Sequence, residues 1–135
     1  MVQSVFLKIP QVSFFQEYAE MHEYFIVQNI LRTVEDLVKD YPGKKVIKAV
    51  FLIGKFSGVE PELLKTALDF FKKGSPLEDA EIVLELEDLK IKCLDCGKEA
   101  TKEKWDITCP FCGSFNTKVV SGEEMFLKTL ELEEE

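Results

Sequence analysis

Histidine is the scarcest chemically useful residue in this sequence, with one copy, His22, among 135 residues. Imidazole is the commonest general base in enzymes and the commonest metal ligand, so one copy excludes any site built from several imidazoles. His22 also lies far along the chain from every cysteine, which leaves no Cys–His pair for nucleophilic catalysis. Carboxylates are plentiful, but nothing in the sequence gathers them into a pocket. We therefore do not expect an enzyme.

Long hydrophobic runs and a basic surplus are missing as well. No run approaches the roughly 18 apolar residues that a membrane-spanning helix needs, and no basic stretch followed by an apolar one suggests a secretory signal. We expect a cytoplasmic protein that does not associate with membranes. The formal charge of −8 argues against an extended nucleic-acid surface, because such binding relies on Lys and Arg neutralising phosphates. The hydrophobic fraction of 46% is that of a globular protein.

Cysteine is also scarce, but its four copies are confined to residues 93–112. They form two C-x-x-C-G motifs, "CLDCG" and "CPFCG", whose cysteine pairs are separated by twelve residues. Each motif lets two thiolates coordinate one ion, and its glycine allows the tight turn to close. Four thiolates at about 2.3 Å complete a tetrahedral shell around Zn²⁺ with no open position, which is typical of a structural site. We predict zinc ligation by Cys93, Cys96, Cys109 and Cys112.

Alternatives to a zinc site remain open at this stage. Sulfur-only tetrahedral sites also accept iron, as in rubredoxin-like electron carriers, and four thiols can be buried or reactive without any metal. Zinc is favoured because a complete second domain would be superfluous in a simple electron carrier. A zinc-ribbon module for nucleic acid or a transcription complex is a further alternative. It is supported by the lysines that surround the cysteines, which are Lys90, Lys92, Lys98, Lys102 and Lys104.

The hydrophobic pattern predicts a small α+β fold. Apolar residues at helical spacing, the Pro42-Gly43 break and β-branched runs indicate the order helix, strand, helix, strand, cysteine insert and strand pair. The expected helices lie at 27–38 and 61–73, and the expected strands at 46–54, 80–88 and within 118–133. We therefore expect two helices on a small mixed sheet of about three strands, with an inserted four-cysteine zinc-ribbon module.

The chain is expected to divide into three parts. Residues 1–20 have mixed character and no clean period, so they read as an N-terminal extension. Residues 21–89 and 117–135 would form one discontinuous α+β domain. Residues 90–116 would form the zinc-binding domain, which is too short to build its own core and would be folded by metal binding.

His22 stands between Met21 and Glu23, where the helical pattern begins. A single histidine at the start of a helix is usually a surface or capping residue. If Met21 were the first residue, however, its free amine, the imidazole of His22 and the intervening backbone nitrogens could encircle one metal ion. Such a tetragonal nitrogen field is preferred by Ni²⁺ or Cu²⁺.

Several segments together resemble one family. "MHEYFIVQNIL", "GKFSGVEPELLKTALDFF", "EDAEIVLEL", "CLDCG", "CPFCGS" and "SGEEMFLKTLELE" occur in the order seen in the HypA/HybF family, the nickel metallochaperones of nickel–iron hydrogenase maturation. The resemblance covers Met21 to about Glu133. The cysteine motifs alone are shared with many unrelated proteins, whereas the Met-His-Glu opening combined with "GVEPELL" and the C-terminal segment is much more specific.

This resemblance implies a function and a set of residues. Members are small α+β proteins that accept nickel as cargo and pass it toward the hydrogenase large subunit, working with a GTPase partner (HypB); some also serve urease. Met21 would donate its amine and His22 its side chain, the backbone nitrogens of His22 and Glu23 would complete the square, and the Glu23 carboxylate would tune the site. The four cysteines match the family's zinc ligands. A monomer or weak homodimer is expected.

One departure from the family concerns the nickel motif. In the family Met-His-Glu stands at the start of the chain, whereas twenty residues precede it here. With those residues present, the Met21 nitrogen is an amide and the amine ligand is lost. The simplest explanation is a start codon assigned too early. A second departure is the short interval between the cysteine pairs, where some relatives carry a long insert.

Overall fold

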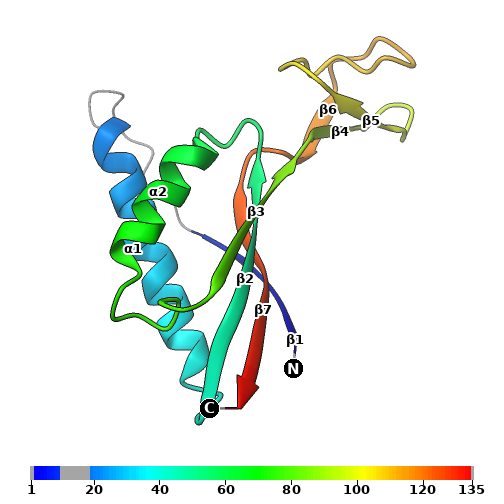
Figure 1. Cartoon of the computed structure of the whole chain (residues 1–135). Helices are drawn as coiled ribbons and strands as arrows, with labels where there is room; N and C mark the ends of the chain where they lie inside the picture. The colour runs from blue at the N-terminus through cyan, green and yellow to red at the C-terminus, as the bar shows by residue number, and fades with distance from the viewer. Residues whose placement is uncertain (1, 10–18, 135) are drawn as a thin grey trace. The chain divides into compact units, whose positions relative to one another are not determined.

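The computed structural model describes residues 2–9 and 19–134, with the side chains of residues 19–22 outside that description. The chain splits into two compact units, whose elements are labelled in Figure 1. The first unit contains residues 1–52, 60–85 and 125–135, and the second contains residues 53–59 and 86–124. Each unit is therefore assembled from segments that are distant in the sequence.

The first unit is built on a four-stranded sheet with the order β1-β7-β2-β3. Two helices, α1 and α2, cover one face of this sheet (Figure 1). The bounds of these elements are β1 Val2–Lys8, α1 Ala19–Val38, β2 Lys44–Gly54, α2 Pro61–Phe71, β3 Glu81–Glu87 and β7 Met125–Glu134. The α+β class is thus confirmed, and the sheet contains one strand more than the sequence indicated.

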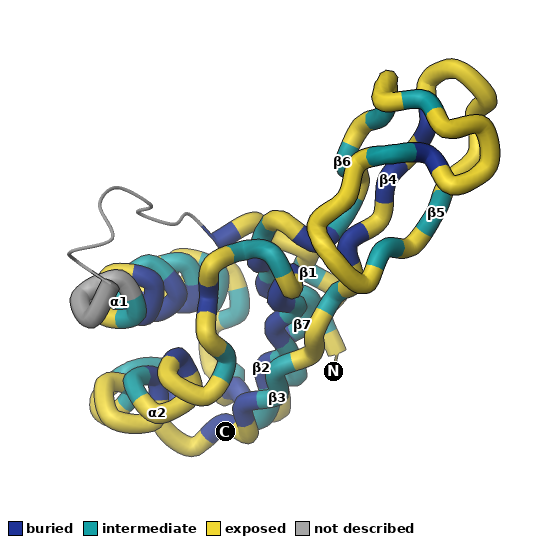
Figure 2. The backbone as a smooth tube through the Cα atoms, turned by 90° about the horizontal axis from the view of Figure 1, so that it is seen from above, coloured by how far each residue is buried: buried dark blue, intermediate teal, exposed yellow. Residues whose placement is uncertain are grey.

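The core of the first unit lies between the helices and the sheet, where buried segments of α1, β2 and β7 appear dark blue in Figure 2. Of the apolar residues that the helical spacing places on one face of α1, Val27, Ile30, Leu31 and Val34 are buried, and Leu37 and Val38 at its end are half-buried. Burying such side chains contributes roughly 1.5–3 kcal/mol each, so the packing of α1 against the sheet is a large part of the unit's stability. The facing side chains that are fully buried include Leu64, Leu68, Phe51, Met125 and Leu127.

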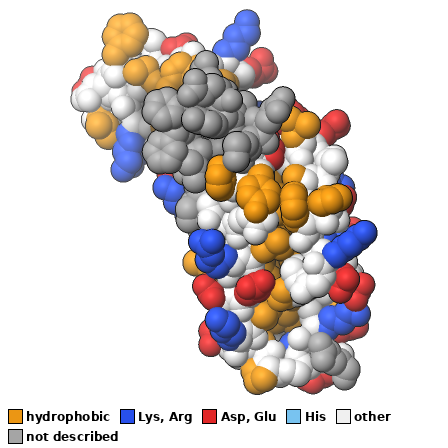
Figure 3. Space-filling view, turned by 90° about the vertical axis from the view of Figure 1, so that its left-hand side faces the viewer, with side chains coloured by type: hydrophobic (Ala, Val, Ile, Leu, Met, Phe, Trp, Pro, Cys, Tyr) orange, Lys and Arg blue, Asp and Glu red, His pale blue; other side chains and the backbone are white. Residues whose placement is uncertain are grey.

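Helix α2 begins as its sequence predicts. Pro61 occupies the first turn, where its missing N–H costs nothing, and the side chain of Glu60 accepts a hydrogen bond from the backbone N–H of Glu62. Leu64 and Leu68 are fully buried. Helical spacing predicts Phe71 on the same face, but Phe71 is the last residue of α2 and is 37% exposed; its ring packs edge-on against Tyr24 of α1, with 5.2 Å between ring centroids. Figure 3 shows hydrophobic side chains gathered on the helical face of this unit.

Strand β1 is the element that the sequence did not reveal. It pairs antiparallel with β7, so that Gln3 lies opposite Leu130 and Lys8 opposite Phe126. The register shifts between Ser4 and Leu7, and Phe6 adopts a φ of 52°, which is the signature of a bulge. The bulge interrupts the alternation of side chains, so residues 2–8 carry no clear strand period. The sequence indicated only an N-terminal extension without a clean period here, whereas residues 2–8 form a strand of the first sheet.

The second unit contains a three-stranded antiparallel sheet with the order β5-β4-β6. Its strands are β4 Leu89–Cys93, β5 Glu99–Lys102 and β6 Thr117–Ser121. We expected β6 to pair with the last strand of the chain, but it pairs with β4 instead, through partners such as Ile91 and Val119. The buried residues here are few, and they include Leu89, Ile91, Cys93 and Cys109.

Two glycines allow a close backbone approach within the second unit. A Cβ atom on Gly54 would lie 2.3 Å from the carbonyl oxygen of Gly122, which is far inside van der Waals contact. Gly122 has a φ of 102°, and a Cβ atom there would meet the Cα atom of Leu89 at 2.6 Å. The backbone N–H of Phe56 donates to the carbonyl of Gly122 at 2.8 Å. Only glycine is compatible with this packing.

Among the described residues, no helix is both long enough and apolar enough to cross a membrane.

Candidate metal centre

The two cysteine motifs form a pair of matching turns, which we call the first knuckle (93–98) and the second knuckle (109–114). In each, the first cysteine N–H donates to the carbonyl five residues later, Lys98 or Ser114, at 2.8 and 2.9 Å. The glycine N–H donates back to the first cysteine's carbonyl at 2.9 Å in both. Gly97 and Gly113 have φ values of 78° and 74°, which explains why each motif ends in glycine.

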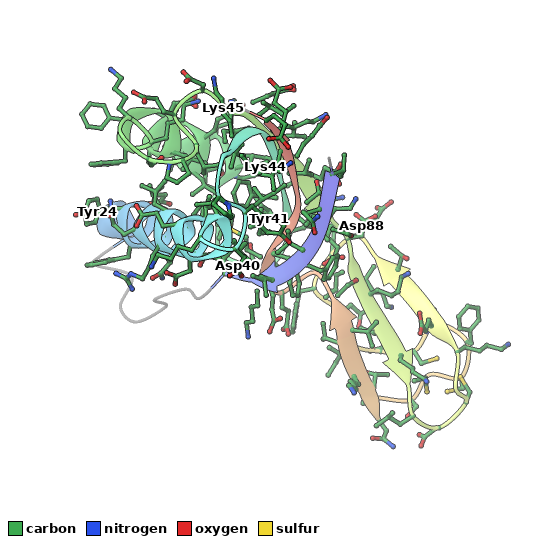
Figure 4. All side chains as sticks on the ribbon, turned by 90° about the horizontal axis from the view of Figure 1, so that it is seen from below. Tyr24, Asp40, Tyr41, Lys44, Lys45 and Asp88 are labelled. Carbon is green, nitrogen blue, oxygen red and sulfur yellow. The ribbon has the colours of Figure 1, made fainter. Side chains whose placement is uncertain are left out.

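The knuckles bring four thiols together. Cys93 Sγ lies 3.6 Å from Cys112 Sγ, and Cys96 Sγ lies 3.7 Å from Cys109 Sγ. All four sulfur atoms lie within 4.8 Å of one another. Cys93 and Cys109 are buried and Cys96 and Cys112 are exposed, so the cluster has a protected side and an open side. Figure 4 shows the sulfur atoms at one end of the three-stranded sheet.

This arrangement fits one tetrahedral metal ion. A metal–sulfur distance of about 2.3 Å places the sulfur atoms of a tetrahedron about 3.8 Å apart. The observed separations of 3.6 and 3.7 Å match that edge, whereas a disulfide bond requires about 2.05 Å. The described residues contain no other group of three or more His, Cys, Asp or Glu side chains whose ligand atoms converge in this way. The predicted four-cysteine cluster is therefore present as a metal-binding site.

The acidity of the thiols shows why the cluster favours a cation. Burial raises the pKa of Cys109, but backbone N–H groups of Cys112 and Phe111 and two neighbouring thiols lower it more, to about 6. The pKa of Cys112 is raised to about 12: a backbone hydrogen bond from Ser114 opposes the rise, but the thiol of Cys93, burial and the other thiols outweigh it. Four thiols this close cannot all ionise alone, whereas a divalent ion removes their mutual repulsion.

A polar contact that sequence reasoning missed joins the two knuckles. Asp95, inside the first C-x-x-C, accepts a hydrogen bond from the hydroxyl of Ser114 and another from the side-chain amide of Asn116 at 3.0 Å. These donors lower the pKa of Asp95, with Ser114 contributing most. The available signal was an acidic residue within one motif and a Ser and an Asn directly after the other, but only the fold shows that they meet.

Two of the lysines near the cysteines make contacts of their own within the second unit. The Lys98 ammonium lies over the Phe111 ring, 4.9 Å from its centroid. Lys102 pairs with Asp106 at 3.2 Å, and Asp106 also accepts from the backbone N–H of Thr108 at 2.9 Å. The first contact joins the two knuckles, and the other two lie within the segment between them.

The predicted nickel residues belong to the first unit. Helix α1 begins at Ala19, so the backbone of Met21, His22 and Glu23 is helical. The side chains of Met21 and His22 lie outside the described residues, and Glu23 is half-buried. Tyr24 and Phe25 follow directly and are exposed, and Figure 4 shows Tyr24 on α1.

A cavity of about 720 Å³ lies elsewhere in the first unit. It is lined by the end of α1, the start of β2, the loop after α2 and the end of β7. Its lysines are engaged, because Lys44 pairs with Glu134 and Lys45 with Asp79 at 3.4 Å; Figure 4 labels both lysines. None of the predicted ligands lines it, so we do not assign it to the metal chemistry.

The fold and the cysteine cluster together define a class: a small α+β protein that carries a distinct four-cysteine metal-binding ribbon. Comparison with known proteins makes the class specific. The family model described as "Hydrogenase/urease nickel incorporation, metallochaperone, hypA" matches residues 21–132. The chain is 53% identical over 113 residues to the hydrogenase maturation factor HypA of Aquifex aeolicus (strain VF5), covering 84% of this chain and 98% of that protein.

Further relatives agree. The hydrogenase maturation factor HypA of Shewanella oneidensis is 40% identical over 114 residues, which cover 84% of this chain and 97% of that protein. Two solved structures are also similar. "Solution structure of HypA protein" gives a TM-score of 0.68 at 29% identity, covering 85% of this chain and 98% of that one. The structure of "the Ni metallochaperone HypA from Helicobacter pylori" gives 0.60 at 27% identity, covering 83% and 96%.

The chain therefore belongs to the HypA family of nickel-incorporation metallochaperones. The resemblance inferred from its motifs is confirmed.

Proposed function

We propose that this protein is a cytoplasmic, non-catalytic nickel carrier that binds Ni²⁺ through Met21, His22 and Glu23 and delivers it for hydrogenase maturation. Membership of the family and the match that begins at residue 21 support this proposal. By analogy with relatives named hydrogenase maturation factors, the recipient would be the hydrogenase large subunit, with a GTPase partner (HypB) assisting. Delivery to urease is a further possibility that the family description supports.

We further propose that the four-cysteine centre holds a resident zinc ion rather than the nickel cargo. Four thiolates form a closed shell, and a closed shell is suited to structure and not to exchange. Nickel binding through backbone nitrogens, an amine and an imidazole is easier to reverse, because protonation of one donor opens the site. The supporting observation is the near-tetrahedral spacing of the sulfur atoms, 3.6 Å for Cys93–Cys112 and 3.7 Å for Cys96–Cys109.

The start of α1 bears on how nickel would bind. The first four N–H groups of a helix have no partner within the helix. With α1 beginning at Ala19, the Glu23 nitrogen lies beyond these groups and is committed to the helix. In a chain that begins at Met21, the nitrogens of both His22 and Glu23 would be available, together with a free amine. The nickel site therefore needs either that shorter form or unwinding of the first helical turn.

A nickel titration of two forms of the zinc-loaded protein tests this function. One form begins at Met1 and the other at Met21, and intact mass of the natively expressed protein identifies which form the cell makes. We expect the Met21 form to bind one equivalent of Ni²⁺ and to develop the weak visible band of a square-planar site. Equal binding and equal spectra for the Met1 form would mean that the donor set lies elsewhere in the chain.

A further inference from the structure

The contacts of Asp95 extend from one knuckle to the other. Its carboxylate belongs to the first knuckle, between Cys93 and Cys96, whereas its donors are the last residue of the second knuckle, Ser114, and Asn116, two positions beyond it. The Ser114 hydroxyl donates to one carboxylate oxygen and the Asn116 side-chain amide donates to the other at 3.0 Å. Both oxygens of Asp95 are therefore used in holding residues that are 19 and 21 positions away.

The partners of Asp95 are themselves fixed in place. Ser114 Oγ accepts a hydrogen bond from the backbone N–H of Asn116 at 3.0 Å, so its single hydrogen is free to point at Asp95. The backbone N–H of Leu94 donates to the carbonyl of Asn116 at 2.9 Å. Leu94 and Asp95 are thus joined to Ser114 and Asn116 by one backbone bond and two side-chain bonds, and the Lys98 ammonium over the Phe111 ring is a further contact between the knuckles.

These contacts act on the separation of the two knuckles, on which the geometry of the metal site depends. The hydrogen bonds within each knuckle fix the two sulfurs of one C-x-x-C motif, but they do not fix one knuckle against the other. The closest sulfur pairs, Cys93–Cys112 and Cys96–Cys109, both join different knuckles. β4 and β6 remain paired as far as Cys93 and Thr117, and Asp95 continues this connection beyond the end of the sheet.

We propose that Asp95 is a positioning residue of the metal centre, which clamps the two knuckles at the separation that four-thiolate ligation requires. The clamp makes the site partly preformed and slows the loss of its metal, so that the resident ion stays bound while nickel is exchanged elsewhere. The last statement rests on the proposed zinc occupancy. The clamp itself rests only on the contacts between the knuckles.

The rate of zinc transfer from the full-length, zinc-loaded protein to an excess of a chromophoric chelator tests the clamp. We expect Asp95→Ala to release zinc about tenfold faster, in line with the usual effect of residues that orient metal ligands. Ser114→Ala removes the other side of the same contact without changing any charge and should accelerate release in the same direction. The Asp95→Ala/Ser114→Ala double variant should release zinc at about the rate of Asp95→Ala, because the bond between Asp95 and Ser114 is already absent from that variant.

Glu99→Gln is the matched control. Glu99 is exposed on β5 of the same ribbon, so this change removes an equal charge without affecting the contact between the knuckles. Its release rate should equal that of the unmodified protein. Equal acceleration by Glu99→Gln and Asp95→Ala would show a simple charge effect and would overturn the clamp, as would a release rate for Asp95→Ala that is unchanged.

Cobalt titration of the reduced, metal-free protein separates this proposal from the zinc assignment. Tetrahedral Co²⁺–thiolate ligation gives characteristic ligand-field bands, whatever metal the native protein carries. The clamp predicts weaker cobalt binding and altered bands for Asp95→Ala and Ser114→Ala, and identical behaviour for Glu99→Gln. Absence of zinc from the purified protein would overturn the zinc assignment but not the clamp. If Asp95→Ala fails to fold by circular dichroism, Ser114→Ala decides the outcome alone.

Discussion

The Sγ atoms of Cys93 and Cys112 lie 3.6 Å apart, although 19 positions separate these cysteines along the chain. Their approach combines two local features, the knuckles, with one nonlocal feature, the pairing of β4 with β6. The metal centre is consequently coupled to the folding of the second unit. The first unit, in contrast, has its own core between the helices and the four-stranded sheet.

Metal removal should therefore affect the two units differently. We expect the purified protein to be colourless and to contain one zinc ion. Chelation under reducing conditions should collapse the amide chemical-shift dispersion of residues 93–116, because four neighbouring thiols lose the cation that compensates them. Signals from the core of the first unit, such as Ile30 and Leu127, should persist. A red iron–thiolate absorbance would instead favour the rubredoxin-like alternative, and an unchanged apo spectrum would show that metal has no structural role.

The close approach at Gly54 predicts a severe effect from one methyl group. Gly54→Ala places a Cβ atom 2.3 Å from the Gly122 carbonyl oxygen, so the backbone must shift. We expect a loss of about 3 kcal/mol in the free energy of unfolding. Gly58→Ala is the control, because Gly58 has a φ of 81° but open space around its Cα atom. It should cost only about 1 kcal/mol. Urea denaturation measures both, and equal losses would contradict the crowding at Gly54.

The unexpected strand β1 can be tested through its aromatic contact. Phe6 stacks on Phe126 of β7, with 5.0 Å between ring centroids and 28° between ring planes. We expect Phe6→Ala to lower the free energy of unfolding by about 1 kcal/mol and to increase hydrogen exchange along β1. Val2→Ala is the control, because Val2 is 63% exposed. If both variants are as stable as the unmodified protein, β1 contributes nothing to the fold.

Acid should weaken the ion pair at the end of the first sheet. Lys44 donates to Glu134, and this hydrogen bond, helped by the lysine's charge, lowers the pKa of Glu134 below its ordinary value of 4.5. A lowered folded-state pKa stabilises the protein above about pH 4.5, and this contribution is lost as the pH falls through the lowered value. Lys44→Ala should return the pKa of Glu134 toward 4.5 in a carboxyl NMR titration.

The control for this titration is Lys39→Ala, which removes the exposed pair between Lys39 and Asp36 on α1. The pKa of Glu134 should not respond to it. A Glu134 pKa that is equally low with and without Lys44 would show that another group stabilises the carboxylate.

The sequence predicted those parts of the structure that depend on short-range patterns. The apolar stripe of α1, the start of α2 at Pro61 and both knuckles each follow from residues within a few positions of one another. The residues around His22 alone left a surface role, Ni²⁺ and Cu²⁺ open, and the family resemblance then favoured nickel.

The missed features depend on contacts between distant residues. β1 pairs with β7 across most of the chain, and the bulge at Phe6 hides its alternation. The link from Asp95 to Ser114 exists only once β4 and β6 are paired. Phe71 has the spacing of a core residue, but its ring ends against Tyr24 near the surface because α2 ends there. Spacing along one element cannot reveal its neighbours.

The most direct test of the division between cargo nickel and resident zinc is a nickel titration of His22→Ala. The comparison uses zinc-loaded protein, unmodified and variant, both beginning at Met21, with Glu35→Gln, an exposed position further along α1, as the control. Loss of the imidazole should abolish the one-equivalent nickel site while zinc content and circular dichroism stay unchanged, and Glu35→Gln should bind nickel as the unmodified protein does. If His22→Ala still titrates with one equivalent of Ni²⁺, the nickel site is not at His22 and the proposed division fails.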